Sequence, residues 1–475
     1  MQSRYLETPQ NLTLRSAAKA SIFLRKYKLP MVLMFFHAPL GLVMMNAGSI
    51  AAVHAYAVVL FGIYWAIQRR KSLEKVALIV AYIVSAEVLW RMVHAPIYWE
   101  FGKYAAGLVM ITALAVRGKW KLPSLPLAYF VFLLPACFLT LMNNDFDIAK
   151  DKLSFNMSGP FLLFISCWFF SQLKVNWLQL RKILFWLIIP LFSVAVTTLF
   201  YTVTEENIQF TGESMRATSG GFGPNQVSAM LGLGVFVSLV CYLLFKNRLK
   251  EKYCFGLLAV FFAAQSIMTF SRGGIYNAAG GILAILIFQM QNAGKGIKQI
   301  LVVAVIAGFF MLAIFPRMNE FTGGALQKRF ENTDSTGRSE IAAADFQIFA
   351  ENPAFGVGVG EAYGYREKYF GKQVAAHTEF TRVIAEHGIF GIFSLLTLAA
   401  MAFFLFRRQK TSLGKAVVIG FIVWSSLFML NTGMRLAAPA FIWSLSFLAI
   451  LSIRIRKRKF LTLKKINKLE TYKSS

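Results

Sequence analysis

The feature that most constrains this chain is a recurrence of apolar blocks of about 17 to 20 residues, each long enough to cross a lipid bilayer as a helix. The 475 residues are 57% hydrophobic and include 46 Phe, a composition that excludes an ordinary soluble globular domain. Because the apolar blocks recur along most of the chain, the sequence predicts an all-α, polytopic membrane helix bundle.

We expect about 12 to 14 membrane spans within one integral-membrane domain that covers residues 1–475. The candidate spans are 31–46, 51–67, 76–93, 104–116, 125–142, 155–172, 183–201, 225–245, 253–270, 274–290, 299–315, 389–406, 416–430 and 436–453.

Lys and Arg gather in alternate connections between these spans and in both tails. The chain carries 50 Lys and Arg against 22 Asp and Glu, which gives a net charge of +28. Cytoplasmic loops of membrane proteins are enriched in Lys and Arg, so this alternation predicts that both termini are cytoplasmic. Topology then explains the charge, and we expect membrane lipids, not nucleic acid, as partners of the basic residues.

One long polar segment, 316–388, interrupts the apolar blocks, and the charge alternation places it on the extracytoplasmic side. Its sequence predicts a short amphipathic helix at 339–352 and a second short helix at 378–386, ended by Gly388. The glycine-rich run 356–360 lacks the flanking strand and helix of a dinucleotide-binding motif, which favours a backbone turn that approaches a ligand or packs on the bundle. We expect this loop to carry part of an active site.

His377 stands at the start of the second short helix. A histidine there can act as a general base near neutral pH, because its ordinary pKa is about 6.5. A lone histidine in such a place is more often a helix-terminal or interfacial residue without a catalytic task. Neighbouring motifs on the same side of the membrane therefore decide between these two interpretations.

Two arginines lie next to glycine-rich turns on that side. Arg216 precedes a Gly-Gly-Phe-Gly-Pro-Asn stretch at 220–225, and Arg272 lies within Ser-Arg-Gly-Gly at 271–274. A guanidinium fixed by such a turn at the membrane boundary suits a phosphate group, which it binds through two parallel hydrogen bonds. For either arginine alone, the simpler alternative is contact with lipid headgroups.

Acidic residues and cysteines give weaker indications. Asp145, Asp147 and Asp151 form a cluster like those that hold divalent cations, although a solvated acidic loop is the commoner explanation. The four cysteines lie in or beside apolar blocks without metal-binding spacing, so we expect no disulfide and no metal site.

Several short motifs between residues 210 and 395 occur in a distinctive order. They are Arg216 with the following Gly-Pro-Asn, the Ser-Arg-Gly-Gly turn, Thr-Gly-Arg at 336–338, Asn-Pro at 352–353 with its glycine run, and His-Thr-Glu at 377–379 leading to Glu-His-Gly at 386–388. In this order they resemble the motifs of the bacterial O-antigen ligase and O-antigen polymerase superfamily. That family's histidine is often followed by Asn, whereas Thr378 follows His377 here.

The resemblance implies an integral-membrane glycosyltransferase of the C structural class in the bacterial inner (cytoplasmic) membrane. Such enzymes take a glycan from undecaprenyl diphosphate on the periplasmic face and pass it to an acceptor hydroxyl, without a metal or another cofactor. By position, His377 would deprotonate the acceptor, and Arg216 and Arg272 would bind the diphosphate. Arg338 and Arg382 would be further substrate contacts.

The choice among activities of this superfamily stays open. A ligase that transfers to lipid A core is favoured over a polymerase of O-antigen or exopolysaccharide that extends a growing glycan, and over a protein O-oligosaccharyltransferase. A lipid-linked oligosaccharide flippase is the alternative from another class. A flippase should line a mid-membrane cavity with charge, whereas the arginines here lie at span ends on one side, which favours an enzyme.

Overall fold

The computed structural model of the chain describes residues 29–69, 72–118, 121–206, 208–244, 249–290, 295–332 and 337–451. Both basic tails, predicted to be cytoplasmic, and Thr336 of the Thr-Gly-Arg motif lie outside the described residues.

The described part of the chain is helical almost throughout. The first helix is Leu29–Asn46. The elements that follow are α2 (Gly48–Gln68), α3 (Leu73–Met92), α4 (Phe101–Arg117), α5 (Ser124–Val131), α6 (Leu134–Asn143), α7 (Phe146–Ser171), β1 (Lys174–Asn176), α8 (Trp177–Thr204), η1 (Ala217–Ser219), α9 (Pro224–Leu244), α10 (Leu249–Met268), α11 (Gly273–Met290), α12 (Lys295–Phe309), η2 (Phe310–Ile314), α13 (Phe315–Phe321), α14 (Ala325–Glu331), α15 (Arg338–Glu351), α16 (Ala362–Tyr365), α17 (Glu367–Phe370), α18 (Glu379–Arg408), α19 (Ser412–Thr432), α20 (Ala437–Ser444), η3 (Leu445–Phe447) and β2 (Ala449–Leu451).

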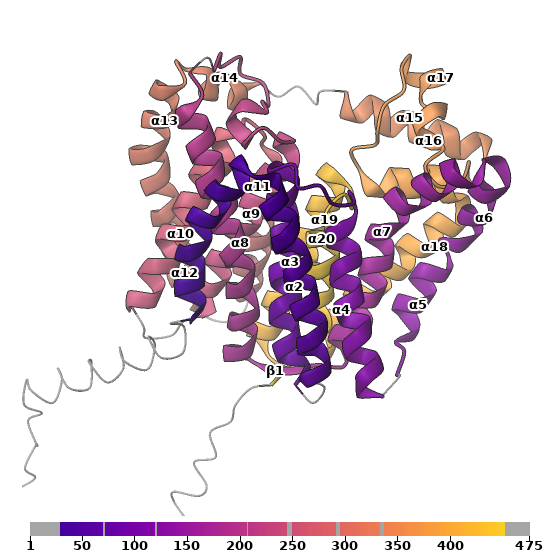
Figure 1. Ribbon diagram of the computed structural model, residues 1–475, viewed down its shortest axis with the longest axis horizontal. Coiled ribbons are helices and arrows are strands. Elements are labelled where there is room, and N and C mark those ends of the chain that lie inside the picture. Colours follow the sequence, from indigo (N-terminus) through magenta and orange to yellow (C-terminus); the bar gives the residue numbers. More distant parts are fainter. Residues whose placement is uncertain are drawn as a thin grey trace, which may run out of the picture.

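The long helices run side by side as one bundle, with the short helices α13–α17 gathered at one end (Figure 1). The all-α, polytopic fold expected from the sequence is confirmed. The expected number of spans is not reached, since ten helices among the described residues are long and apolar enough to cross a membrane. Three further predicted spans also form helices, namely α3, α4 and α10. They are not counted among the ten because α4 is only 17 residues long and because charged residues lower the hydropathy of α3 and α10.

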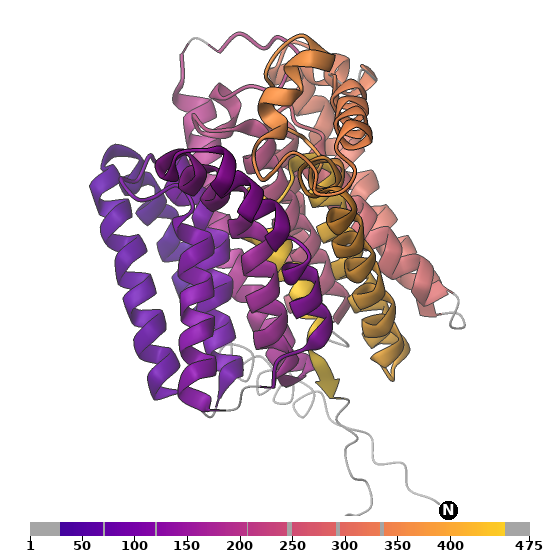
Figure 2. The ribbon, with the colours of Figure 1, turned by 90° about the vertical axis from the view of Figure 1, so that its right-hand side faces the viewer.

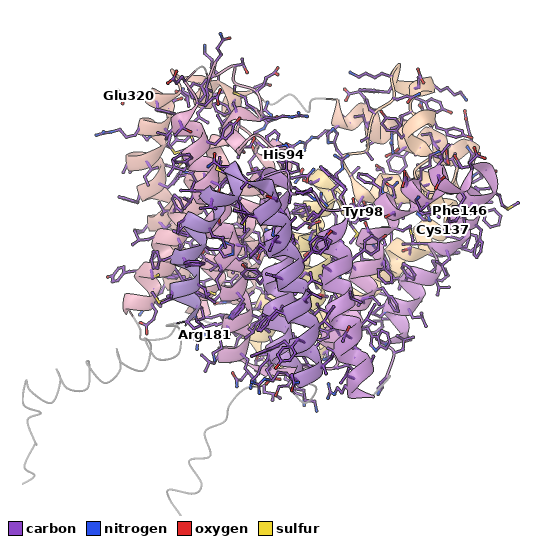
Figure 3. All side chains as sticks on the ribbon, in the orientation of Figure 1. His94, Tyr98, Cys137, Phe146, Arg181 and Glu320 are labelled. Atoms are coloured by element: carbon purple, nitrogen blue, oxygen red, sulfur yellow. The ribbon has the colours of Figure 1, made fainter. Side chains whose placement is uncertain are left out.

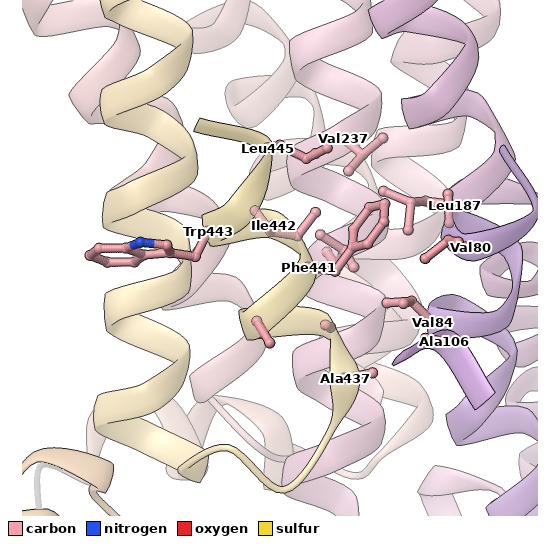
Figure 4. Packing of buried hydrophobic residues seen from close by; sticks show 14 of the residues in the cluster. Val80, Val84, Ala106, Leu187, Val237, Ala437, Phe441, Ile442, Trp443 and Leu445 are labelled. Atoms are coloured by element: carbon pink, nitrogen blue, oxygen red, sulfur yellow. The ribbon is translucent and has the colours of Figure 1, made fainter. Parts of the chain in front are cut away.

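The last predicted span, 436–453, is wrong as a continuous helix. Its residues form α20, η3 and then β2, which pairs in parallel with β1. Every residue of α20 is buried. Figure 4 shows Phe441 and Ile442 directed toward Val80 of α3 and Leu187 of α8. This short helix is apolar because it fills the centre of the bundle, where its side chains are held by van der Waals packing against neighbouring helices.

The bundle end that carries α13–α17 is called the loop end below. Figure 3 shows Glu320, His94 and Tyr98 at this end and Arg181 toward the opposite end. The polar segment 316–388, predicted to be extracytoplasmic, therefore contributes helices to one end of the bundle, and the side of the membrane that this end faces stays a prediction.

The polar loop begins later than predicted, because the helix continues through Pro316 to Phe321. Proline has no N–H and clashes with the preceding turn of an α-helix. The five residues before α13 form the wider π-helix η2, Phe310–Ile314, and such a turn relieves the conflict.

Both predicted short helices are present. The amphipathic one is α15, Arg338–Glu351, and it lies with α16 and α17 over the start of α18 (Figure 2). The second is the first part of α18, which begins at Glu379 and is interrupted at Gly388, where φ is 60° and ψ is −138°.

Candidate functional site

The glycine-rich run packs against the interruption in α18. The interruption frees the carbonyls of Ala385 and Glu386, which accept hydrogen bonds of 3.1 Å from Val357 N and Gly358 N. A Cβ at Gly356 would lie 2.4 Å from the carbonyl carbon of Glu386, so only glycine permits this approach. Of the two roles expected for this run, the structure shows packing on the bundle.

His377 lies in the segment that leads into α18. Thr378 is the N-cap of that helix, and its hydroxyl accepts from Phe380 N at 3.3 Å. Thr and Asn are both suitable N-caps, so the replacement of Asn by Thr at this position keeps the local geometry.

Two arginines hold the backbone of the His377 segment. Arg366 Nη1 donates to Val374 O at 3.0 Å, and Arg435 Nη2 donates to Ala376 O at 2.9 Å. Arg366 is buried and pairs with Asp345 of α15 at 2.7 Å, while the other Asp345 oxygen accepts from Thr381. The segment is therefore fixed between α15, α18 and the turn that follows α19.

The charge around His377 is positive. Burial, and after it the charges of Arg338, Arg435 and Arg366, lower the pKa of His377 from 6.5 to about 4. The imidazole is therefore neutral at physiological pH, which is the form a general base needs.

Arg338 has no carboxylate near it among the described residues, whereas the charge of Glu379 opposes part of the charge of Arg435. Within the described ranges neither forms an ion pair, and Arg338 Nη1 donates only to Asn431 Oδ1, at 3.3 Å. Burial and the positive charges of Arg272 and Arg329 lower the pKa of Arg338. Several cations held together in this way favour an anion between them.

The turn that carries Arg435 is clamped by buried charged side chains. Lys103 Nζ donates to Met434 O at 3.2 Å, Arg91 Nη1 donates to Arg435 O at 3.1 Å, and Glu379 accepts from Met434 N at 3.2 Å. Arg91 and Lys103 are balanced by Glu87 and Glu100, all four being buried. Paired charges inside a bundle hold their partners in one geometry, because a shift would leave a charge unsatisfied.

Arg272 lies in the turn before α11, and this turn contacts the Gly-Pro-Asn motif. Ser271 Oγ donates to Asn225 Oδ1 at 2.8 Å, and Ser228 Oγ donates to Ser271 O at 2.7 Å. The Arg272 guanidinium donates to Asn332 O. Two motifs that are far apart in the sequence therefore meet at the loop end.

Arg216 lies at a different part of the loop end. It is exposed, and its carbonyl closes a turn by accepting from Ser219 N and Gly221 N at 3.0 and 2.9 Å. The side chain lines a cavity with Arg91 and Trp99, and neither His377 nor Arg272 lines that cavity. Of the five predicted site residues, the structure associates His377, Arg338 and Arg272 electrostatically, and Arg216 stands apart.

Arg382 is already paired. Its guanidinium forms ion pairs with Glu379 and Glu386, which lie three residues before it and four residues after it on α18. These three residues line a cavity of about 350 Å³, together with Ala376, Thr378, Arg366 and Arg435. His377 is absent from that lining, although its two chain neighbours belong to it.

The acidic cluster does not form a cation site. Asp145 is the N-cap of α7, and Asp147 pairs with Lys150 at 3.0 Å on the surface. Among the described residues, no group of three His, Cys, Asp or Glu side chains is arranged to hold a metal ion. The four cysteines are free thiols.

Sequence reasoning missed Arg435. It is a single arginine in the short connection between two apolar blocks on the same side as Arg272, so the criterion that selected Arg272 would also have selected it. Arg91 and Lys103 were missed as well, because they lie at the ends of predicted spans where a basic residue is usually interfacial.

Residues 257–396 match the protein-family model described as O-Antigen ligase. The matched segment includes Arg272, Arg338, His377 and Arg382, and leaves out Arg216 and Arg435. No curated protein matches the chain.

Proposed function

This chain belongs to the O-antigen ligase superfamily through its domain at residues 257–396, and from that premise we propose that it is an integral-membrane glycosyltransferase. Its donor is a glycan linked to undecaprenyl diphosphate, and its acceptor is a hydroxyl group, with lipid A core favoured. The reaction takes place at the loop end of the bundle, on the periplasmic face of the bacterial inner membrane.

The observation that carries this proposal is a neutral histidine beside two arginines that form no ion pair in the described part of the chain. Burial and the charges of Arg338, Arg435 and Arg366 lower the pKa of His377 to about 4, and of these arginines Arg338 and Arg435 form no ion pair. A base for a hydroxyl and a set of cations for a diphosphate are the two needs of this reaction.

The proposed chemistry is a single displacement at the anomeric carbon of the donor. His377 accepts the proton of the acceptor hydroxyl while that oxygen bonds to the anomeric carbon. The bond from this carbon to the diphosphate oxygen breaks, and the electron pair leaves with the diphosphate. Arginines stabilise the charge that develops on the leaving group, because a preorganised cation costs no reorganisation during the reaction.

The arginines divide into two roles. Arg272, Arg216 and Arg338 are proposed to contact the diphosphate or the glycan, and Arg435 joins them because it acts on His377 and has no ion pair in the described ranges. The nitrogens of Arg382 are engaged by Glu379 and Glu386. We therefore infer that Arg382 positions Glu379, and through it the Arg435 turn, and does not contact substrate.

A transfer assay tests the activity and its acceptor. Purified protein in nanodiscs is given an undecaprenyl-diphosphate-linked glycan, either with lipid A core or with no second acceptor. Glycan on lipid A core is the expected product. A ladder of longer lipid-linked glycans without an added acceptor would instead mean a polymerase, and transfer only to an added acceptor protein would mean a protein O-oligosaccharyltransferase.

A flippase is distinguished in sealed liposomes. If the same donor crosses the bilayer and no covalent product forms with any acceptor, the glycosyltransferase proposal is wrong.

A further inference from the structure

A second cavity at the loop end is walled by aromatic side chains and is named the aromatic cavity. Trp90, Tyr98, Trp99, Phe101 and Phe222 line it, from the end of α3, the following connection, the start of α4 and the turn before α9. Its volume is about 480 Å³, within the range of about 300–1,000 Å³ that is usual for small-molecule sites.

Trp99 presents ring surface to this cavity. Its side chain is 48% exposed, and the Arg91 guanidinium lies over the ring, 4.7 Å from its centroid. Phe222 packs against the same ring at a tilt of 47°. With one face held by Arg91, the ring is fixed in orientation and its exposed part is free for a ligand.

Polar groups line the same cavity. Glu87, Arg91, Gln226 and Arg216 also line the cavity. Arg216 has no side-chain hydrogen bond or ion pair within the described residues. Aromatic side chains that only anchor a protein at the membrane interface do not need polar side chains around them. A ligand with one apolar face and several hydroxyls needs aromatic and polar side chains together.

His94 adds a side chain at a position where backbone geometry favours glycine. It follows the last turn of α3 with φ of 51°, and Ala95 N closes the turn on Trp90 O at 3.0 Å. Glycine is the usual residue after such a helix end, because a Cβ costs free energy in the left-handed region. The exposed His94 side chain lines the aromatic cavity, so a ligand contact is a reason for its presence.

Hydrogen bonds connect the aromatic cavity to the His377 segment. Arg91, which covers Trp99, donates to the carbonyl of Arg435, and Arg435 in turn donates to the carbonyl of Ala376, next to His377.

We propose that the aromatic cavity binds a pyranose ring of the glycan substrate. The positively polarised C–H face of the ring stacks on Trp99, and its hydroxyls bond with His94 and the other polar lining groups. The identification of this pyranose as part of the substrate rests on the proposed function. It can belong to the donor or to the acceptor, because both carry pyranose rings that can stack on Trp99 in the same way.

Direct binding tests the cavity without the reaction. The probes are the free oligosaccharides released by mild acid from the host cell's lipid-linked glycan and from its lipid A core, each titrated into the full-length protein by calorimetry. Trp99→Ala should weaken binding about tenfold. Trp99→Phe should keep most of it, and Phe146→Ala, at an exposed aromatic residue outside the cavity, should leave it unchanged.

His94→Gly separates binding from folding. Glycine removes the backbone cost, so the thermal midpoint should rise or stay the same, while binding weakens about fivefold through the lost hydrogen bond. Unchanged affinity in both Trp99→Ala and His94→Gly, or no binding to the wild-type protein, would overturn the proposal.

Kinetics distinguish the two sources of the ring and keep the two proposals apart. A raised KM for the lipid-linked donor assigns the ring to the donor, and a raised KM for the acceptor assigns it to the acceptor. If the wild type binds the oligosaccharide through Trp99 but transfers nothing, the cavity stands and the glycosyltransferase function fails. If transfer proceeds and Trp99→Ala binds normally, the cavity assignment alone is wrong.

Discussion

A histidine among arginines is the proposed chemical centre of this molecule. His377 is neutral because burial and three positive charges oppose its protonation. In the proposed reaction the same charges attract the diphosphate, so one group of side chains would serve both the base and the leaving-group site. These roles give two predictions for single residues.

The first concerns pH. A base with a pKa of about 4 loses activity only as pH falls toward 4, because protonation removes the accepting lone pair. The transfer rate constant should therefore be level from about pH 8 to pH 6 and show its acid limb below pH 5. Arg338→Gln removes a charge that lowers the pKa, so the limb should move to higher pH. A wild-type limb near 6.5, or no movement in the variant, would argue against His377 as the base.

The second concerns Arg435. Arg435→Ala removes a cation near His377 and the hydrogen bond to Ala376 O. Loss of one preorganised donor costs about a hundredfold in kcat. Arg317→Ala, at an exposed arginine of α13 at the same end of the bundle, is the matched control and should retain activity. Equal activity of the two variants would remove Arg435 from the site.

At the scale of elements, the interruption of α18 organises the loop end. Gly388 ends the first helical part, and the glycine-rich run supplies the hydrogen bonds that the freed carbonyls need. The sequence predicted both the break and the short helix, because a glycine after a periodic segment is a local signal. The partner of the break could not be predicted, since Val357 and Ala385 meet only in the folded chain.

Gly388→Ala tests this arrangement. A Cβ there would lie 2.5 Å from Gly356 N in a backbone region open almost only to glycine, so a loss of about 3 kcal/mol in unfolding free energy is expected. Gly364→Ala is the control, because nothing lies within 4 Å of a Cβ at that position. Thermal denaturation in detergent compares the two variants, and equal midpoints would contradict the packing role of Gly388.

Two other elements show why hydropathy alone misplaces boundaries. The helical run formed by α12, the π-helix η2 and α13 continues to Phe321, past the expected span end at residue 315. The apolar segment 436–453 was expected to be a span, but its helix α20 is short and lies in the centre of the bundle. Hydropathy cannot separate the two cases, because full burial inside a bundle and contact with lipid both require apolar residues.

At the scale of the whole molecule, motifs from distant parts of the chain meet at one end of the bundle. Short-range patterns were sufficient for the fold class and for the two short helices at the loop end. They were insufficient for Arg435, whose carbonyl is held by Arg91, 344 positions away. Contacts of such long range depend on how the helices pack, and no local window contains them.

The orientation of the bundle is tested by thiol labelling. In a chain whose four native cysteines are replaced, Glu320→Cys should react in intact spheroplasts with a thiol reagent that cannot cross the membrane. Lys174→Cys, exposed near the opposite end, should react only after permeabilisation. The reverse pattern would place the loop end in the cytoplasm and contradict the periplasmic site.

The most direct measurement is the single-turnover rate of glycan transfer by His377→Ala, with donor binding measured on the same preparation. We expect transfer to fall by about a thousandfold, because general-base catalysis contributes in that range, while donor binding stays within about twofold. Lys372→Ala, exposed in the same loop, should behave as the wild type. Transfer by His377→Ala within tenfold of the wild-type rate would show that His377 is not the base.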